Sequence, residues 1–324
     1  MTPTLRRAAL VALRVVVIGA ALLFLLRGVD WTEVRGTLRS TNLLLLASVV
    51  ALNGGMMALK ASRLRLLLGQ APSFTSCFLA TLTTSAINNV VPLRGGDMAR
   101  VWMLERHARI TKSAAAAVAV VEALFDLISL AVVAFVGGLA LHEQRWAVGT
   151  TSILLGAAVV LMWLMKRMNG NRAFESADKP VANGVLGRIR RLVERAEPGM
   201  RALRKPETIA VAMALSLIVW VFEMGMVMLS ARAIHLSVGP ALAIVTLLGI
   251  NLAMALPSMP ASAGAFESGA TLVLVLSGIP KAQAIAFALL YHVIQVVPVT
   301  IAGLAVVSRA GLTLDRLPAP ESAE

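Results

Sequence analysis

Polar and charged residues gather at two places in this sequence where long apolar runs are interrupted. The first is the stretch NNVVPLRGGD, residues 88–97, and the second is LPSMPASAGAFE, residues 256–267. In the first stretch, Asp97 can cap the helix that follows, and the amides of that helix's first turn, with Arg94 and Arg100 nearby, favour a bound phosphate. The alternative is structural: Asp97 pairs with one of these two arginines and only holds the turn.

The second stretch places a carboxylate near the start of another helix. Ser262 is the expected N-cap, and Glu267 lies in the first turns that follow. A carboxylate at a helix N-terminus is stabilised by the helix dipole, so Glu267 can be a simple cap. It can equally bind a cationic headgroup or take up and release a proton, and the sequence does not decide between these roles.

Two acids, Glu122 and Asp126, lie four residues apart inside an apolar run, so they face the same side of one helix. An unpaired charge at the bilayer centre costs roughly 3 kcal/mol or more, and acids within a membrane are therefore functional candidates. We expect Arg100 or Arg94 to be their partner, in a buried charge network.

The later apolar runs carry further polar side chains. Glu223 is an isolated acid in one of them, and Tyr291, His292 and Gln295 share the last. A lone histidine on an apolar helix is more often a satisfied hydrogen-bonding group than a catalyst, and we expect the former for His292.

Catalytic motifs are missing from the sequence. It contains no HExxH, Walker, GxSxG or DxD pattern, and its single cysteine, Cys77, excludes an internal disulfide and a cysteine-based metal site. We therefore expect no catalytic residue, no metal and no cofactor. If the protein transports a substrate, movement must be downhill or driven by an ion gradient.

The amino-acid composition predicts the kind of helices that hold these polar residues in place. Of the 324 residues, 58% are hydrophobic and 15% are charged, and the mean hydropathy is +0.81. These values predict an all-α polytopic membrane protein, with a single transmembrane domain over residues 1–307 and a short cytoplasmic tail over 308–324. Six apolar runs are long enough to cross a bilayer: residues 8–26, 42–59, 114–140, 146–165, 208–230 and 282–307.

The net charge of +13 is unevenly distributed along the chain. Residues 166–207 contain 11 Lys/Arg against 5 Asp/Glu, which places this loop on the cytoplasmic side. Within it, residues 184–205 read as a basic amphipathic helix that lies on the anionic inner leaflet. No aromatic residues are interleaved, which argues against nucleic acid. The same rule places both termini in the cytoplasm, and we expect a bacterial inner membrane.

Charge also orients the two interrupted segments. A full crossing by residues 74–91 would leave the five following basic residues outside, so we predict a re-entrant hairpin over about 74–112 that enters from the cytoplasm. A second hairpin, over about 240–278, enters from the opposite side. Opposed broken helices predict a binding site at the membrane midplane and an inverted repeat. The matching positions are Asn88, Pro92, Gly96 and Asp97 in one half, and Asn251, Pro257, Gly264 and Glu267 in the other.

With these motifs the sequence resembles the flippase-like membrane proteins named after the transmembrane region of lysylphosphatidylglycerol synthase. The resemblance covers nearly the whole chain and is concentrated in NNVVPLRGGDMARVWML, in VVEALFDLISL and in residues 256–304. It implies translocation of a phospholipid or related lipid, as in the flippase half of the multiple peptide resistance factor. The residues that it would place along the lipid path are Asn88, Pro92, Arg94, Gly96, Asp97, Arg100, Glu122, Asp126, Pro260, Gly264, Glu267 and His292, to which the repeat adds Asn251.

The chain departs from this family pattern in two ways. Relatives often have an arginine directly after the first acid of the second block, where this chain has Ala123, so one candidate phosphate clamp is absent. No segment corresponds to a synthase domain, and we do not expect lysine transfer.

Several alternatives stay open at this point. The substrate is expected to be a membrane lipid with an anionic headgroup, but hopanoids and lipids linked to polyprenyl phosphate are also associated with relatives. A lipid-modifying transferase and a scaffold for lipid or glycolipid synthesis are the other functions considered. The sequence does not decide whether the chain forms a homo-oligomer.

Overall fold

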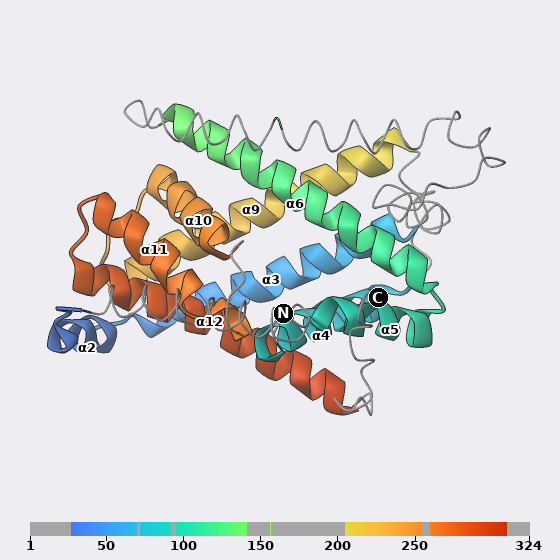
Figure 1. Ribbon diagram of the computed structural model, residues 1–324, viewed down its shortest axis with the longest axis horizontal. Helices are drawn as coiled ribbons and strands as arrows, with labels where there is room; N and C mark the ends of the chain where they lie inside the picture. The colour runs from blue at the N-terminus through green and yellow to red at the C-terminus, as the bar shows by residue number, and fades with distance from the viewer. Residues whose placement is uncertain are drawn as a thin grey trace, which may run out of the picture. The chain divides into compact units, whose positions relative to one another are not determined.

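The residues that the computed structural model describes form nine α-helices and one short 3-10 helix, joined by turns and short irregular segments (Figure 1). The described residues are 27–69, 72–91, 95–140, 156, 205–254 and 260–309. Contacts divide the chain into two compact units. The first unit comprises Met1–Met57, Leu82–Ala99 and Val221–Glu324, and the second comprises Ala58–Thr81 and Arg100–Trp220.

Four helices are long and apolar enough to cross a membrane, so the chain is a multi-pass membrane protein. They are α3 (Leu43–Leu67), α6 (Lys112–Ala140, with its apolar part at Ala114–Val136), α9 (Pro206–Ala233) and α12 (Lys281–Arg309). These helices confirm the predicted apolar helices at 42–59, 114–140, 208–230 and 282–307. The other two predicted spans, 8–26 and 146–165, lie outside the described residues, as does nearly all of the basic loop 166–207.

Both interrupted segments are pairs of shorter helices, as predicted. The first pair is α4 (Phe74–Val90) and α5 (Gly95–Ala108), and the second is α10 (Pro240–Met254) and α11 (Ala265–Leu276). At 1.5 Å per residue, α4 and α10 are roughly 26 and 23 Å long, shorter than the hydrocarbon core of about 30 Å. The breaks are therefore confirmed, while the re-entrant path and the inverted repeat stay predictions.

The helices α10 and α11 lie against each other within the first unit (Figure 1). Two glycines allow this contact. A Cβ atom at Gly249 would lie 3.1 Å from the carbonyl oxygen of Gly269, and one at Gly269 would lie 2.5 Å from the carbonyl oxygen of Gly249. The two backbones thus touch directly, because neither residue has a side chain to separate them.

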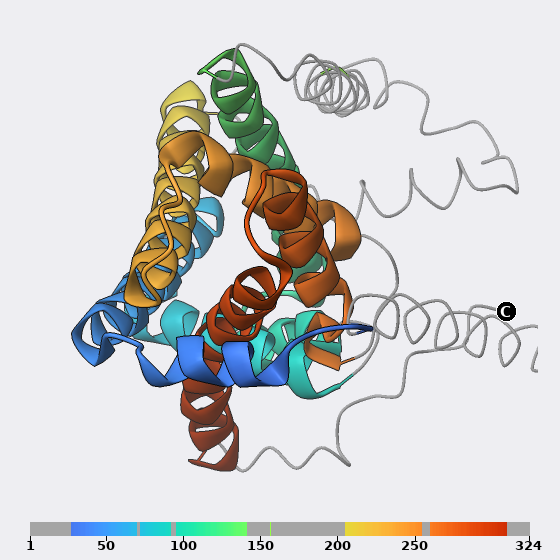
Figure 2. The ribbon, with the colours of Figure 1, turned by 90° about the vertical axis from the view of Figure 1, so that its left-hand side faces the viewer.

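A short helix that the sequence analysis did not predict, α2 (Trp31–Arg39), packs against α12 (Figure 2). Its N-cap is Asp30, whose carboxylate accepts hydrogen bonds from the backbone N–H groups of Thr32 (2.8 Å) and Glu33 (3.3 Å). These bonds hold the pKa of Asp30 below its usual value. On the other face, Val34 is buried in a cluster with Ala282, Ile285 and Ala286 of α12.

The helix α12 continues through a proline. Pro298 has no N–H, so the carbonyl of Ile294, four residues earlier, loses its usual donor. The fully buried amide of Asn53 on α3 donates to this carbonyl at 3.3 Å and to that of Gln295 at 3.1 Å. A side chain from another helix therefore replaces the hydrogen bond that the proline removes.

We predict that Asn53→Ala lowers the free energy of unfolding by about 1–3 kcal/mol, because a buried carbonyl is left without a partner. In a Pro298→Ala background the cost of Asn53→Ala should fall, since residue 298 regains the N–H that serves Ile294. Unfolding by a denaturing detergent, followed by far-UV circular dichroism, measures both values. Asn251→Ala is the control, because that amide donates to Leu247 within its own helix. Equal costs of Asn53→Ala in the two backgrounds would contradict this role.

Candidate functional site

The carboxylate of Glu267 joins α11 to α12. Its Oε2 accepts a hydrogen bond from the backbone N–H of Gly264 at 2.7 Å and so caps α11, while its Oε1 lies 2.6 Å from Nδ1 of His292. The prediction of Ser262 as the N-cap is wrong. The cap is Gly264, which adopts a φ of 85° that is favourable only for glycine, and Ser262 belongs to a preceding 3-10 helix.

The other ring nitrogen of His292 holds this 3-10 helix, η4 (Pro260–Ser262). Its Nε2 lies 2.9 Å from the carbonyl oxygen of Ala261, and the ring stacks on Phe266 with centroids 4.4 Å apart. Both nitrogens thus have partners, which confirms His292 as a satisfied hydrogen-bonding group. Its role in a lipid path is a separate prediction.

The backbone of η4 is strained. Ala261 and Ser262 have φ values of 55° and 57°, in the left-handed region that side chains other than glycine rarely occupy. Such residues cost on the order of 1 kcal/mol each and persist where surrounding contacts impose the conformation. The contact of His292 with Ala261 is one such constraint.

In the first broken segment, Asn88 and Gly96 connect the two helices across the break. Asn88 Oδ1 accepts a hydrogen bond from the backbone N–H of Gly96 at 2.9 Å. The prediction that Asp97 caps α5 is therefore corrected: α5 begins at Gly95, and Asp97 lies inside its first turn. A Cβ at Gly96 would overlap the carbonyl oxygen of Thr84, so only glycine fits at this contact.

Both broken segments are attached to α12. On one side His292 binds Glu267, and on the other Thr300 accepts a hydrogen bond from Asn89 Nδ2 at 2.8 Å. Eight residues separate the two attachment points, which is roughly 12 Å along a helix. A glycine supports the second contact, since a Cβ at Gly303 would lie 2.5 Å from the carbonyl oxygen of Leu82 in α4. All of these contacts lie within the first unit.

The other predicted site residues described in the first unit make no contact that joins a broken segment to α12. Asn251 lies in the last turn of α10, where its amide donates to the carbonyl of Leu247 at 2.8 Å, and Pro260 begins η4. Pro92, Arg94 and Pro257 lie outside the described residues, so the predicted pairing of Arg94 with Asp97 stays untested. Glu223, noted only as an isolated acid, accepts hydrogen bonds from Tyr291 (3.1 Å) and Gln295 (2.7 Å) on α12.

A charge cluster, buried except for the partly exposed Asp126, occupies the second unit. Arg100 pairs with Glu122, as predicted, and both side chains are nearly inaccessible. Asp126 pairs instead with Arg63, whose Nη2 donates to Oδ2 at 3.1 Å, so the prediction of Arg100 as its partner is wrong, while Arg94 lies outside the described residues. Arg63 Nε also lies 3.6 Å from Glu122, and Arg63 Nη1 donates to Ser216 at 2.6 Å.

Sequence analysis missed Arg63 because the predicted span ended at residue 59, whereas α3 continues to Leu67. The available signal was the apolar run that continues around the arginines in LKASRLRLLL. The cluster contains two arginines and two carboxylates, so it is neutral. An incoming phosphate would have to displace a carboxylate from Arg63 or Arg100.

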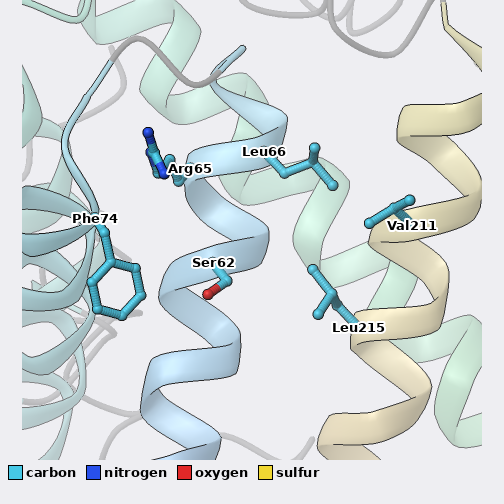
Figure 3. Close-up of a pocket in the computed structure, with 6 residues that line it drawn as sticks. All are labelled: Ser62, Arg65, Leu66, Phe74, Val211 and Leu215. Carbon is cyan, nitrogen blue, oxygen red and sulfur yellow. The ribbon is translucent and has the colours of Figure 1, made fainter.

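A small groove lies on the second unit between α3, α4 and α9 (Figure 3). Its volume is about 200 Å³, and its lining residues are Ser62, Arg65, Leu66, Phe74, Val211 and Leu215. Arg65 is the charged residue of this lining, and its Nε donates to the carbonyl of Pro72 at 3.1 Å. None of the predicted site residues lines the groove, and its volume is below that of an ordinary ligand pocket. Among the described residues there is also no group of three metal-ligating side chains.

Comparison with known families agrees with the sequence resemblance. The family model for the lysylphosphatidylglycerol synthase TM region matches residues 11–303. The chain belongs to this family. The match takes in both broken segments, all of α3, α6 and α9, and α12 as far as residue 303, and membership is consistent with a lipid-related function in the membrane. A search of curated proteins finds no match to the chain.

The charge cluster makes a prediction about stability. Arg63→Met leaves Asp126, whose side chain is 39% exposed, without its arginine and leaves the buried Glu122 with one arginine instead of two, and should cost about 1–3 kcal/mol of unfolding free energy. Arg63→Met combined with Asp126→Asn restores neutrality and should recover part of the loss. Detergent unfolding measures both changes.

The matched control is Lys112→Gln, which breaks an ion pair with Glu105 whose side chains are 68% and 44% exposed. That change should cost between 0 and about 1 kcal/mol. If Arg63→Met has an equally small effect, the cluster does not hold the second unit together.

Proposed function

We propose that this member of the family is a lipid translocase that moves a polar-headed lipid between the leaflets of a bacterial inner membrane. The observation that carries the proposal is the attachment of both broken segments to α12, about 12 Å apart along the helix. Broken helices that meet near the middle of a bundle are the usual construction of a transporter's binding site. The headgroup would be held between them.

The backbone at the two breaks supports this assignment. Residues outside a helix leave amide and carbonyl groups unpaired, and lipid cannot satisfy them. The breaks therefore favour a polar space lined by protein, in which water or a headgroup supplies the missing hydrogen bonds. A lipid crossing the membrane needs such a space for its headgroup, while its acyl chains remain in the bilayer.

Charge favours a phosphate at the first break. The helices α5 and α11 both begin immediately after a break, so each break presents a helix N-terminus, which attracts negative charge. At α11 this position is already occupied by Glu267. The first turn of α5 also contains an acid, Asp97, but among the described residues this acid accepts no hydrogen bond from a backbone N–H, so an anionic group would bind there, next to Arg94 in the sequence. The second break suits a cationic or hydroxyl group.

We also propose an orientation of the chain in the membrane and a transport function without catalysis. Both termini would lie in the cytoplasm, with residues 184–205 on the anionic inner leaflet. No described contact favours the transferase or scaffold alternatives. Transport without catalytic chemistry is therefore the function that we assign.

Reconstitution into liposomes tests this function. Wild-type protein should move labelled lipids between leaflets at least about tenfold faster than protein-free liposomes, a barrier change of ~1.4 kcal/mol. Arg94→Ala should slow anionic lipids by a similar factor, because it removes a positive charge at the start of α5, whereas Asp97→Asn removes a negative charge from the first turn and should not slow them. Anionic, zwitterionic and isoprenoid-phosphate lipids are compared in parallel.

Two matched variants serve as controls. Arg106→Ala removes a cation that stacks on Trp102 further along α5, and Glu33→Gln removes an exposed acid on α2. Both should retain wild-type rates. Folded wild-type protein that moves none of the three lipid classes above background would contradict the translocase function.

A further inference from the structure

The hydrogen bonds of Glu267 and His292 determine how many protons the pair carries. The carbonyl oxygen of Ala261 can only accept, so Nε2 of His292 must donate to it. Nδ1 of the ring lies 2.6 Å from Oε1 of Glu267, and two acceptors this close would repel unless a proton lay between them. The pair therefore holds one proton at this contact, on either the ring or the carboxyl group, and is neutral in both cases.

The two carboxylate oxygens have separate roles. Oε2 accepts from the backbone N–H of Gly264 and caps α11 whether or not the proton is present. Oε1 faces His292 and depends on the proton. Loss of the proton would thus break the contact with His292 without uncapping α11.

The surroundings isolate the pair from compensating charge. The side chains of His292 and Glu267 are 10% and 18% exposed, and α10, which packs against α11, contributes no titratable group. The other titratable groups on the described parts of elements that contact α11 or α12 within this unit are Glu33, Arg35, Arg39, Asp97, Glu223, Arg232, Lys281, Tyr291 and Arg309. Of these, Glu223 contacts α12 beside the pair, through Tyr291 and Gln295. When the proton leaves, the pair keeps one negative charge near the acid Glu223, and this charge has no cationic partner among the described residues.

We infer that Glu267 and His292 form a proton-binding site that holds the turn Pro260–Ser262 against α12 when loaded and releases it when empty, coupling lipid movement to proton movement. The coupling rests on the proposed translocase function, whereas the proton site does not. On unloading, the bond from the proton to Nδ1 or Oε1 breaks, the proton passes to water, and a carboxylate then faces the ring lone pair. The ring turns away, and the strained residues Ala261 and Ser262 lose the hydrogen bond that holds them.

Cysteine labelling tests the site without measuring transport. In a Cys77→Ala background, Ser262→Cys places one thiol in the turn, and Ser308→Cys, exposed on α12, corrects for thiolate formation. Between about pH 5 and about pH 9, a range in which histidine-containing pairs exchange protons, the corrected labelling rate of Ser262→Cys should rise at least threefold. A flat corrected rate would overturn the proton site.

Two variants should remove the pH dependence in opposite ways. Glu267→Gln can still cap α11 and donate to His292 Nδ1, so labelling should stay slow at every pH. His292→Ala removes the contact with Ala261, so labelling should be fast at every pH. If Glu267→Gln behaves like the wild type, the proton is not held by this pair, and the inference fails.

Liposomes with and without a pH gradient test the coupling. The wild-type rate should change about tenfold when a protonophore collapses the gradient, and any rate that remains in Glu267→Gln should not respond. Wild-type lipid movement that is insensitive to the gradient overturns the coupling and leaves the translocase intact. Labelling that depends on pH, without any lipid movement, overturns the translocase and supports the proton site.

Discussion

The hydrogen bonds from Asn53 to the backbone of α12 are the interaction on which the first unit depends. Pro298 lies between His292 and Thr300, the two residues that attach the broken segments, so a break in the helix at Pro298 would separate the two attachments. The side chain of Asn53 supplies a donor to the carbonyl that the proline leaves without one. A buried amide on α3 thereby keeps α12 continuous, and the continuity of α12 sets the distance between the two breaks.

In the second unit the main constraint is that charged side chains lie in the protein interior. Arg63, Arg100, Glu122 and Asp126 balance one another, and Ser216 adds a further hydrogen bond. Buried ion pairs are weak evidence for stability, because desolvation offsets much of their attraction, but the loss of one member leaves a buried charge unpaired. The cluster therefore fixes which faces of α3, α6 and α9 meet, and its neutrality is the reason that we do not assign headgroup binding to the cluster itself.

Hydropathy and the prolines and glycines at the breaks were sufficient to predict four spans and two broken segments. The partners at the site were harder to predict. Local rules named Ser262 and Asp97 as caps, whereas Gly264 and Asn88 have these roles, because the choice depends on a positive φ and on a contact across the break. The pairing of Arg63 with Asp126 joins residues 63 positions apart, and no local pattern connects them. The sequence predicted which residues carry charge, while tertiary packing determines which of them meet.

The contact between Gly249 and Gly269 limits how the second broken segment can move. With backbone against backbone, neither helix can slide or rotate past the other without a collision between main-chain atoms. A displacement of this segment that keeps the contact must therefore carry α10 and α11 together. When α10 and α11 move together in this way, a small movement at η4 displaces both helices along their whole length.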